Sequence, residues 1–185
     1  MTRFESLAVA ARRAALEDPA GLAVADGRVR WTWRELNERV DSVALGLTDA
    51  GVEAGDRVVV LAAPTAPAVV ALHAIARIGA VAVPLETRLT RAEVVSATAV
   101  VDPLVVVHDD QHAVSAAVLR LPLLGLEDLT SGQTGPGLAA DSSAPSEQAA
   151  IVMTSGTTGG PKAAILSVAA LVASAEAWLA VLPPA

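Results

Sequence analysis

Strand-like apolar runs alternate with helix-like segments along most of this chain, and this alternation restricts its fold more than any other feature. Residues 57–62 form an almost continuous apolar run, typical of a strand buried on both faces of a parallel sheet. A helical segment from about residue 67 to 78 and a strand at 81–85 follow it. The pattern continues with a strand at 104–107, a helix near 112–119 and a strand at 121–126. We therefore predict an α/β fold with a largely parallel sheet and helices on both faces.

The amino-terminal segment carries turn signals of its own. Leucine and alanine residues at helical spacing predict a helix over residues 5–17, and Pro19 ends the pattern. Strands are expected at 22–25 and 29–31, because the dipeptide Asp26-Gly27 between them suits a tight hairpin turn.

Two later helices are expected to begin with a capping box. Thr32 can accept a hydrogen bond from the backbone N–H of Glu35, whose carboxylate can reach back to the cap. Thr90 and Glu93 repeat this spacing. Helices should therefore start directly after Thr32 and after Thr90, and Gly51 should close the first of them.

Composition and charge exclude several classes of protein. A hydrophobic content of 53% with one Phe, three Trp and no Tyr predicts a globular, aliphatic core. The net charge is −7, with thirteen Lys and Arg against twenty Asp and Glu. We expect no nucleic-acid partner, because sequence-independent binding requires clustered cations that neutralise phosphates.

The stretch 58–76 has transmembrane length and no formal charge, but two prolines interrupt it and arginines bracket it. A strand, a turn and a buried helix explain it better, so we expect no membrane span. Charged residues interrupt the amino terminus, which shows no secretory signal, and the chain has no cysteine. These features favour a cytoplasmic location.

The residues most often found in metal sites show no ligand pattern. The three histidines, His73, His108 and His112, lack metal-ligand spacing, so a packed or solvated structural role is expected for each. Asp109 and Asp110 are expected to form a solvated turn after a strand. We predict no metal site in this chain.

The most chemically distinctive stretch runs from Thr154 to Lys162. Apolar runs at 149–153 and 163–166 flank it, so it should be a loop at the carboxyl end of a strand. Its glycines permit close backbone approach, its hydroxyls are donors, and its lysine is cationic, as in an anion-binding cradle. The candidate nucleotide-binding residues are Thr154, Ser155, Gly156, Thr157, Thr158, Gly159 and Lys162.

The P-loop of nucleotide triphosphatases is the nearest rival pattern. Aligning Gly156 with its first glycine leaves Pro161 where the second glycine should stand and Ala163 in place of the magnesium-binding hydroxyl. A strand-like run follows the lysine where the P-loop would open a helix. A P-loop phosphotransferase is therefore a weak alternative.

The stretch resembles the signature loop of the adenylate-forming superfamily, which includes AMP-forming acyl-CoA synthetases, luciferases and non-ribosomal peptide adenylation domains. Every position from Thr154 to Lys162 fits the superfamily pattern Thr-Ser-Gly-Thr-Thr-Gly-x-Pro-Lys. The chain departs from the usual pattern at Met153, which replaces an aromatic residue. Val168 and Ala170 stand where many members have a His and an Asn.

Other segments strengthen the resemblance along the whole chain. Residues 32–36 are similar to the family's Thr-aromatic-x-Glu-Leu helix start, and 55–58 to its Gly-Asp-x-Val strand entry. Residues 78–90 are similar to its Gly-Ala-x-x-x-Pro-Leu-Asn-x-Arg-Leu segment, with Glu86 in the Asn position. The resemblance favours an acid-CoA ligase, with an o-succinylbenzoate-CoA ligase as one option.

The resemblance implies a two-step reaction with ATP, Mg²⁺ and coenzyme A. A carboxylic acid attacks the α-phosphate of ATP to give acyl-AMP and pyrophosphate, and coenzyme A then displaces AMP to give a thioester. In family terms the loop holds the β- and γ-phosphates. No catalytic residue of the family is assigned within this chain.

The chain is well under half of a family member's length, so the resemblance implies an incomplete, amino-terminal portion of the large domain. Residues 1–127 are expected to form a first α/β subdomain, 128–148 a polar surface linker, and 149–185 the phosphate-binding loop and the start of a second subdomain. Apolar surface left uncovered at the carboxyl-terminal edge is expected to favour self-association.

A non-catalytic nucleotide-binding or interaction module on the same scaffold is the main alternative. The departures at Met153, Val168 and Ala170 favour it, whereas the intact phosphate-binding pattern favours the ligase.

Overall fold

The computed structural model describes residues 6–131, 147–154 and 162–181. Its sheet strands are β1 (Leu22–Ala25), β2 (Arg30–Thr32), β3 (Arg57–Leu61), β4 (Val81–Pro84), β5 (Val105–His108), β6 (Leu123–Gly125), β7 (Gln148–Thr154) and β8 (Lys162–Ser167). Its helices are α1 (Leu7–Glu17), α2 (Trp33–Asp49), α3 (Ala66–Arg77), α4 (Arg91–Thr98), α5 (Ala113–Ala116), α6 (Leu126–Ser131) and α7 (Val168–Val181), with short 3₁₀ turns η1 (Asp110–His112) and η2 (Ala117–Leu119) on either side of α5.

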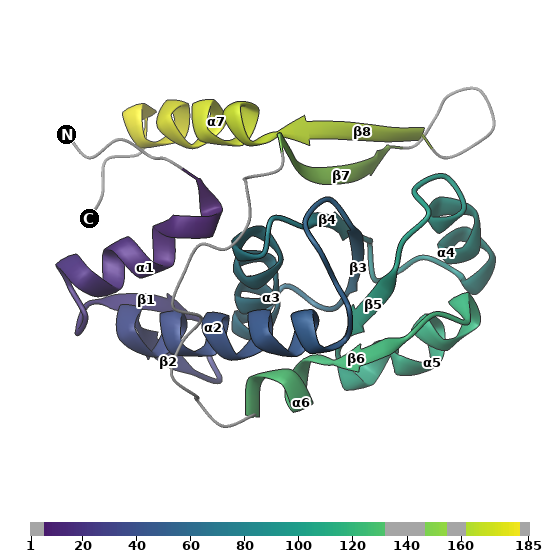
Figure 1. Cartoon of the computed structure of the whole chain (residues 1–185), viewed down its shortest axis with the longest axis horizontal. Helices are drawn as coiled ribbons and strands as arrows, with labels where there is room; N and C mark the ends of the chain where they lie inside the picture. The colour runs from purple at the N-terminus through teal and green to yellow at the C-terminus, as the bar shows by residue number, and fades with distance from the viewer. Residues whose placement is uncertain (1–5, 132–146, 155–161, 182–185) are drawn as a thin grey trace.

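Six strands form one sheet in the order β6-β5-β3-β4-β7-β8. All neighbours are parallel except β7 and β8, which are antiparallel. Strands β1 and β2 form a separate antiparallel hairpin. The predicted α/β fold with a largely parallel sheet is therefore confirmed, and Figure 1 shows helices on both sides of this sheet.

Alternate residues of the central strands enter two different hydrophobic cores. Val58 and Val60 of β3 belong to a core that includes buried residues of α2 and α3. Val59 and Leu61 point the other way, into a core that includes Val94 of α4. The continuous apolar run in β3 is explained by this arrangement, because both faces of a central parallel strand are covered.

The expected hairpin and caps form. Asp26 accepts hydrogen bonds from the backbone N–H groups of Arg28 and Val29, at 3.0 and 3.1 Å, and Gly27 has the positive φ of 85° that the turn requires. Both capping boxes are complete: the side chains of Thr32 and Thr90 accept from the third helical residue, whose carboxylate accepts from the cap.

The segment after β5 differs from the expectation. The helix expected near 112–119 is a succession of η1, α5 and η2, ended by Arg120 at a φ of 53°. The expected strand at 121–126 is shorter, and α6 begins at Leu126. Leu126 is fully buried and Leu129 packs on the core, so the first residues of the segment expected to be a polar linker form part of α6.

Strands β7 and β8 and helix α7 lie along one margin of the molecule (Figure 1). Strand β7 pairs with β4 at Ala82 and Ala150, so these elements extend the same sheet. Among their described residues only Ile151 is buried. The division of the chain at 128–148 stays a prediction, and residues 132–146 of that segment lie outside the described part.

Candidate functional site

The candidate phosphate site is placed by the antiparallel pair β7 and β8. Strand β7 ends at Thr154 and β8 begins at Lys162, and these two residues are paired across the strands. The Thr154 hydroxyl donates to the backbone carbonyl of Lys162 at 3.3 Å. Two strands therefore flank the signature stretch, as the apolar runs predicted, and the loop expected between them lies outside the described residues.

Two of the predicted nucleotide-binding residues can be located. Thr154 and Lys162 are both exposed at this edge, and Lys162 is the only lysine in the chain. The other five, Ser155, Gly156, Thr157, Thr158 and Gly159, lie outside the described residues.

Alternation along β7 decides which residues support this edge. Ile151 and Met153 face the core that contains α4, whereas Ala150 faces the core that contains α2 and α3. Met153, which stands in the usual aromatic position, is partly buried and packs on the core that contains α4. It anchors the strand end through apolar contact without an aromatic ring.

The connection after β4 brings a second charged group to the same end of the sheet. Arg88 donates to Glu86 through Nε to Oε1 at 3.2 Å and through Nη2 to Oε2 at 3.3 Å. Hydrogen bonds from the Arg88 side chain and backbone lower the pKa of the Glu86 carboxyl, and the same pairing raises the pKa of Arg88. In the sequence, Glu86 is visible only as a departure from the family pattern, and its pairing with Arg88 was not predicted.

A polar cavity of about 290 Å³ lies at the carboxyl ends of β3 and β5. Asp109 in its wall accepts from the backbone N–H of Ala63 at 2.8 Å and also pairs with His112. Burial raises the pKa of Asp109, but these hydrogen bonds outweigh it and the net shift is downward. The expectation of a solvated turn is therefore wrong for Asp109, whose side chain is 13% exposed and ties β3 to η1.

Asp26 has a comparable structural role in the wall of this cavity. Its second oxygen accepts from the backbone N–H of Ala66 at 2.9 Å, at the start of α3. This hydrogen bond and those within the hairpin lower the pKa of Asp26. Its carboxylate therefore joins the hairpin to α3. Among the residues that the structure describes, no group of acidic or histidine side chains could hold a metal ion.

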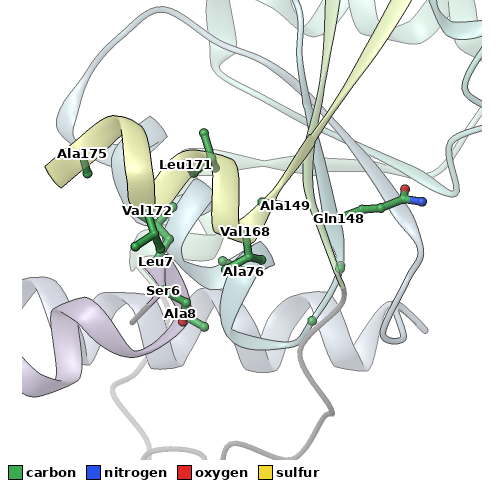
Figure 2. A pocket seen from close by; sticks show the side chains of 12 residues that line it. Ser6, Leu7, Ala8, Ala76, Gln148, Ala149, Val168, Leu171, Val172 and Ala175 are labelled. Carbon is green, nitrogen blue, oxygen red and sulfur yellow. The ribbon is translucent and has the colours of Figure 1, made fainter. Parts of the chain in front are cut away.

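An apolar cavity of about 240 Å³ lies at the opposite end of β7, between α1, α3 and α7 (Figure 2). Leu7, Val168, Leu171 and Val172 supply much of its wall, and the Gln148 side chain points away from them in this view. Val168, which stands in the family's His position, is thus a wall residue of this cavity. Ala170, in the Asn position, is exposed and its N–H donates to Ser167 Oγ at 3.1 Å.

Comparison with known proteins identifies the family. The sequence profile of the family described as AMP-binding enzyme matches residues 9–184. The chain is 35% identical over 156 residues to tenellin synthetase of Beauveria bassiana and 32% identical over 164 residues to a 2-succinylbenzoate–CoA ligase of Bacillus cereus. The chain therefore belongs to the AMP-binding enzyme family.

The fold is also shared with solved structures. The N-terminal domain of FACL13 from Mycobacterium tuberculosis superposes with a TM-score of 0.84 at 24% identity, covering 98% of this chain and 49% of that one. The two curated relatives match 78% and 82% of this chain, which spans only 4% of the synthetase and 33% of the ligase. The likeness thus covers nearly all of this chain and a minor part of its longer relatives.

Enzymes of this family use ATP and Mg²⁺. Lys162 suits the phosphates of a nucleotide, because it is an exposed cation that Thr154 pairs with at the carboxyl end of a mostly parallel sheet. No cluster of carboxylates in the described part fits Mg²⁺. None of the described helices has the length and apolar character needed to cross a membrane.

Proposed function

We propose that the chain forms the phosphate-binding part of an enzyme that activates a carboxylic acid with ATP, as an AMP-forming acid-CoA ligase. The observation that carries the proposal is the pairing of Thr154 with Lys162 at the two ends of the family's signature stretch. The Lys162 ammonium can form charge-assisted hydrogen bonds with phosphate oxygens, each worth about 1.5–3 kcal/mol. We expect Ser155, Gly156, Thr157, Thr158 and Gly159 to complete the phosphate contacts.

The reaction that we propose begins with attack of the carboxylate oxygen on the α-phosphorus of ATP. The bond between this oxygen and the α-phosphorus forms and gives acyl-AMP. The bond from the α-phosphorus to the bridging oxygen of pyrophosphate breaks, and the departing pyrophosphate takes the electron pair. Lys162 would stabilise the charge that develops on this leaving group. In the second step a thiol loses its proton to solvent, its sulfur bonds to the acyl carbon, and the carbon–oxygen bond to AMP breaks, so that a thioester and AMP are released.

The identity of the thiol is the finer part of the proposal. The 2-succinylbenzoate–CoA ligase relative favours coenzyme A. The hybrid PKS-NRPS synthetase relatives, at 31–33% identity, favour another thiol acceptor. We propose coenzyme A because the segments from residue 32 to 90 favour the acid-CoA ligases, and we expect such an enzyme to work in the cytoplasm.

A non-catalytic nucleotide-binding or interaction module is the second candidate. Its support is the apolar character of two positions that are usually aromatic or polar in the family pattern: Met153 packs into a core beside the candidate site, and Val168 lines the apolar cavity at the opposite end of β7. Both functions share phosphate binding, and only the first requires release of pyrophosphate.

We further infer that the exposed edge of β8 associates with a second copy of the chain. Strand β8 is the last of the described strands in the sheet order, and Ile165 within it is 59% exposed. Trp178 and Leu179 of α7 add exposed apolar surface. An unpaired strand edge beside apolar side chains favours pairing with another chain.

The uniqueness of Lys162 allows a direct test of phosphate binding. An amine-specific reagent can react with only Lys162 and the α-amino group, so the latter provides an internal reference. We expect ATP to slow modification of Lys162 at least about threefold, because the reagent must compete with a hydrogen bond between the ammonium and a phosphate. The modification rate of the α-amino group should not change. Equal reactivity with and without ATP would contradict the phosphate-binding role.

Catalysis is tested separately, in a longer protein that joins this chain to the remaining segments of a family member. Carboxylate-dependent pyrophosphate release should fall about tenfold to a hundredfold in Lys162→Ala, because a contact to the leaving group is lost. Arg34→Ala is a matched control, since Arg34 is an exposed cation on α2. Protection of Lys162 without any pyrophosphate release, over a panel of aliphatic and aromatic acids, would instead support the non-catalytic module.

A further inference from the structure

The Glu86–Arg88 pair lies at the same edge of the sheet as the candidate phosphate site. Strands β4 and β7 are parallel neighbours with Ala82 opposite Ala150. Continuing this register four residues along both chains brings position 86 level with Thr154. The backbone N–H of Leu85 still donates to the Val60 carbonyl at 2.9 Å, so pairing with β3 continues one residue beyond β4, and the turn closed by the Leu89 N–H on the Glu86 carbonyl begins directly after it.

Side-chain packing supports the same placement. Leu89, directly after Arg88, packs on the core that contains Leu85 and Ile151. Met153, directly before Thr154, packs on that same core. The connection after β4 and the end of β7 are therefore held against one apolar cluster, and their polar residues emerge beside each other.

The pair is built so that Arg88 can exchange its partner. The Arg88 side chain is 87% exposed and that of Glu86 is 54% exposed. An ion pair with this exposure stabilises the structure little, because water and salt screen both charges. A guanidinium can donate two parallel hydrogen bonds to a phosphate group. A ligand with several phosphate charges therefore attracts Arg88 more strongly than the single Glu86 carboxylate does.

We propose that Arg88 is a second cationic contact for the polyphosphate group bound at Thr154 and Lys162, and that Glu86 holds the guanidinium at this edge until the polyphosphate binds. This inference rests on the proposed phosphate-binding function and adds a specificity-determining residue to it. Glu86 sets a threshold, because a ligand must offer more negative charge than one carboxylate in order to capture Arg88. A monophosphate should therefore gain much less from Arg88 than a triphosphate does.

Two ligands could supply this chemistry: the triphosphate chain of ATP and the phosphates of coenzyme A. Calorimetric titration of the chain with inorganic tripolyphosphate, and separately with coenzyme A, distinguishes them. Arg88→Gln should weaken binding of the ligand that Arg88 contacts about threefold to tenfold at low ionic strength. We expect this loss for tripolyphosphate, and the loss should shrink as salt is added.

Arg91→Gln is the matched control, because Arg91 is an exposed arginine at the start of α4, three residues further along the same segment. It should change tripolyphosphate affinity less than twofold, an order-of-magnitude expectation for a screened surface charge. Equal losses in Arg88→Gln and Arg91→Gln would overturn the proposal and leave only a general effect of charge. A loss in Lys162→Gln without one in Arg88→Gln would also overturn it while the proposed function stands. If the unaltered chain binds no tripolyphosphate, both proposals fail.

Glu86→Gln tests the holding role. Removing the carboxylate should strengthen tripolyphosphate binding more in the unaltered chain than in the Arg88→Gln background, because only the former has a guanidinium to release. A simple loss of local negative charge would give the same gain in both backgrounds, and that result would contradict the role of Glu86. Circular dichroism of each variant should match that of the unaltered chain, since both side chains are largely exposed.

Discussion

The central strands and the β7–β8 margin are built from similar apolar sequence but are buried very differently. Strand β3 pairs with a parallel neighbour on each side, and Val58, Val59 and Leu61 are no more than 1% exposed. Within the described residues, strand β8 has a neighbour on one side only, and Ile165 in its middle is 59% exposed. A similar apolar sequence is therefore buried in the core in one region and exposed at the edge of the sheet in the other.

This difference matters for the candidate site, which lies at the border between the two regions. Thr154 and Lys162 belong to the open margin, whereas Glu86 and Arg88 belong to the connection that leaves the buried strand β4. Binding groups at such a border can combine a fixed scaffold on one side with adaptable groups on the other. Matched substitutions on the two sides of this border should therefore differ in their effect on stability.

Leu61→Ala should have the largest effect. Leu61 is 1% exposed within the core that contains α4, and truncation of such a leucine leaves a cavity that costs about 2–5 kcal/mol of unfolding free energy. Leu179→Ala makes the same chemical change at a residue that is 49% exposed, and it should cost less than about 0.5 kcal/mol. Urea denaturation followed by circular dichroism gives both values, and comparable losses would show that α7 is as firmly packed as the core.

An intermediate effect is expected from His73, which connects α3 to α1 through a hydrogen bond of 3.0 Å between Nδ1 and the carbonyl of Leu7. Burial and the nearby Arg77 lower the pKa of His73 below its usual 6.5, against the opposing effect of the Leu7 carbonyl. The folded state therefore resists protonation. Its stability should be full above pH 6.5 and should decline as the pH falls toward the lowered pKa, by at most about 1.4 kcal/mol per pH unit.

His73→Gln keeps a donor for the Leu7 carbonyl and removes this titration. The unfolding free energy of the variant should depend less on pH than that of the unaltered chain between about pH 5 and 6.5. Asp109, whose pKa is also lowered, loses its contribution only at more acidic pH, so it does not affect this window. Identical pH profiles for the two proteins would show that the site of His73 does not disfavour its charged form.

The smallest effect on stability is expected at the open edge. Ile165→Lys places a charge on β8, where the side chain is already more than half exposed, and it should change the unfolding free energy by less than about 0.5 kcal/mol. In sedimentation velocity the variant should nevertheless contain more monomer than the unaltered chain at the same concentration, because charged residues block pairing of strand edges. An unaltered chain that sediments as a monomer at all concentrations would contradict the proposed self-association.

Local patterns in the sequence determined most of the individual elements. The capping boxes at Thr32 and Thr90, the turn at Gly27 and the strand character of 57–61 depend on residues a few positions apart. The conspicuous stretch between two apolar runs likewise predicted the ends of β7 and β8. Interactions within one turn or one strand are encoded by neighbouring residues, which is why the sequence suffices for them.

Only the tertiary structure decided which of these elements meet. In the sequence, Arg77 is simply one of the two arginines that bracket the apolar stretch 58–76. In the structure its side chain is 1% exposed, and Asp41 and Asn37 of α2 accept its hydrogen bonds. The sequence showed Glu86 only as a departure from the family pattern. The strand order places β4 beside β7, through the pairing of Ala82 with the distant Ala150, and so brings Glu86 to the end of the sheet that carries the candidate site. Such contacts are set by how strands are ordered and how helices pack over them, and no periodicity of two or four residues carries that information.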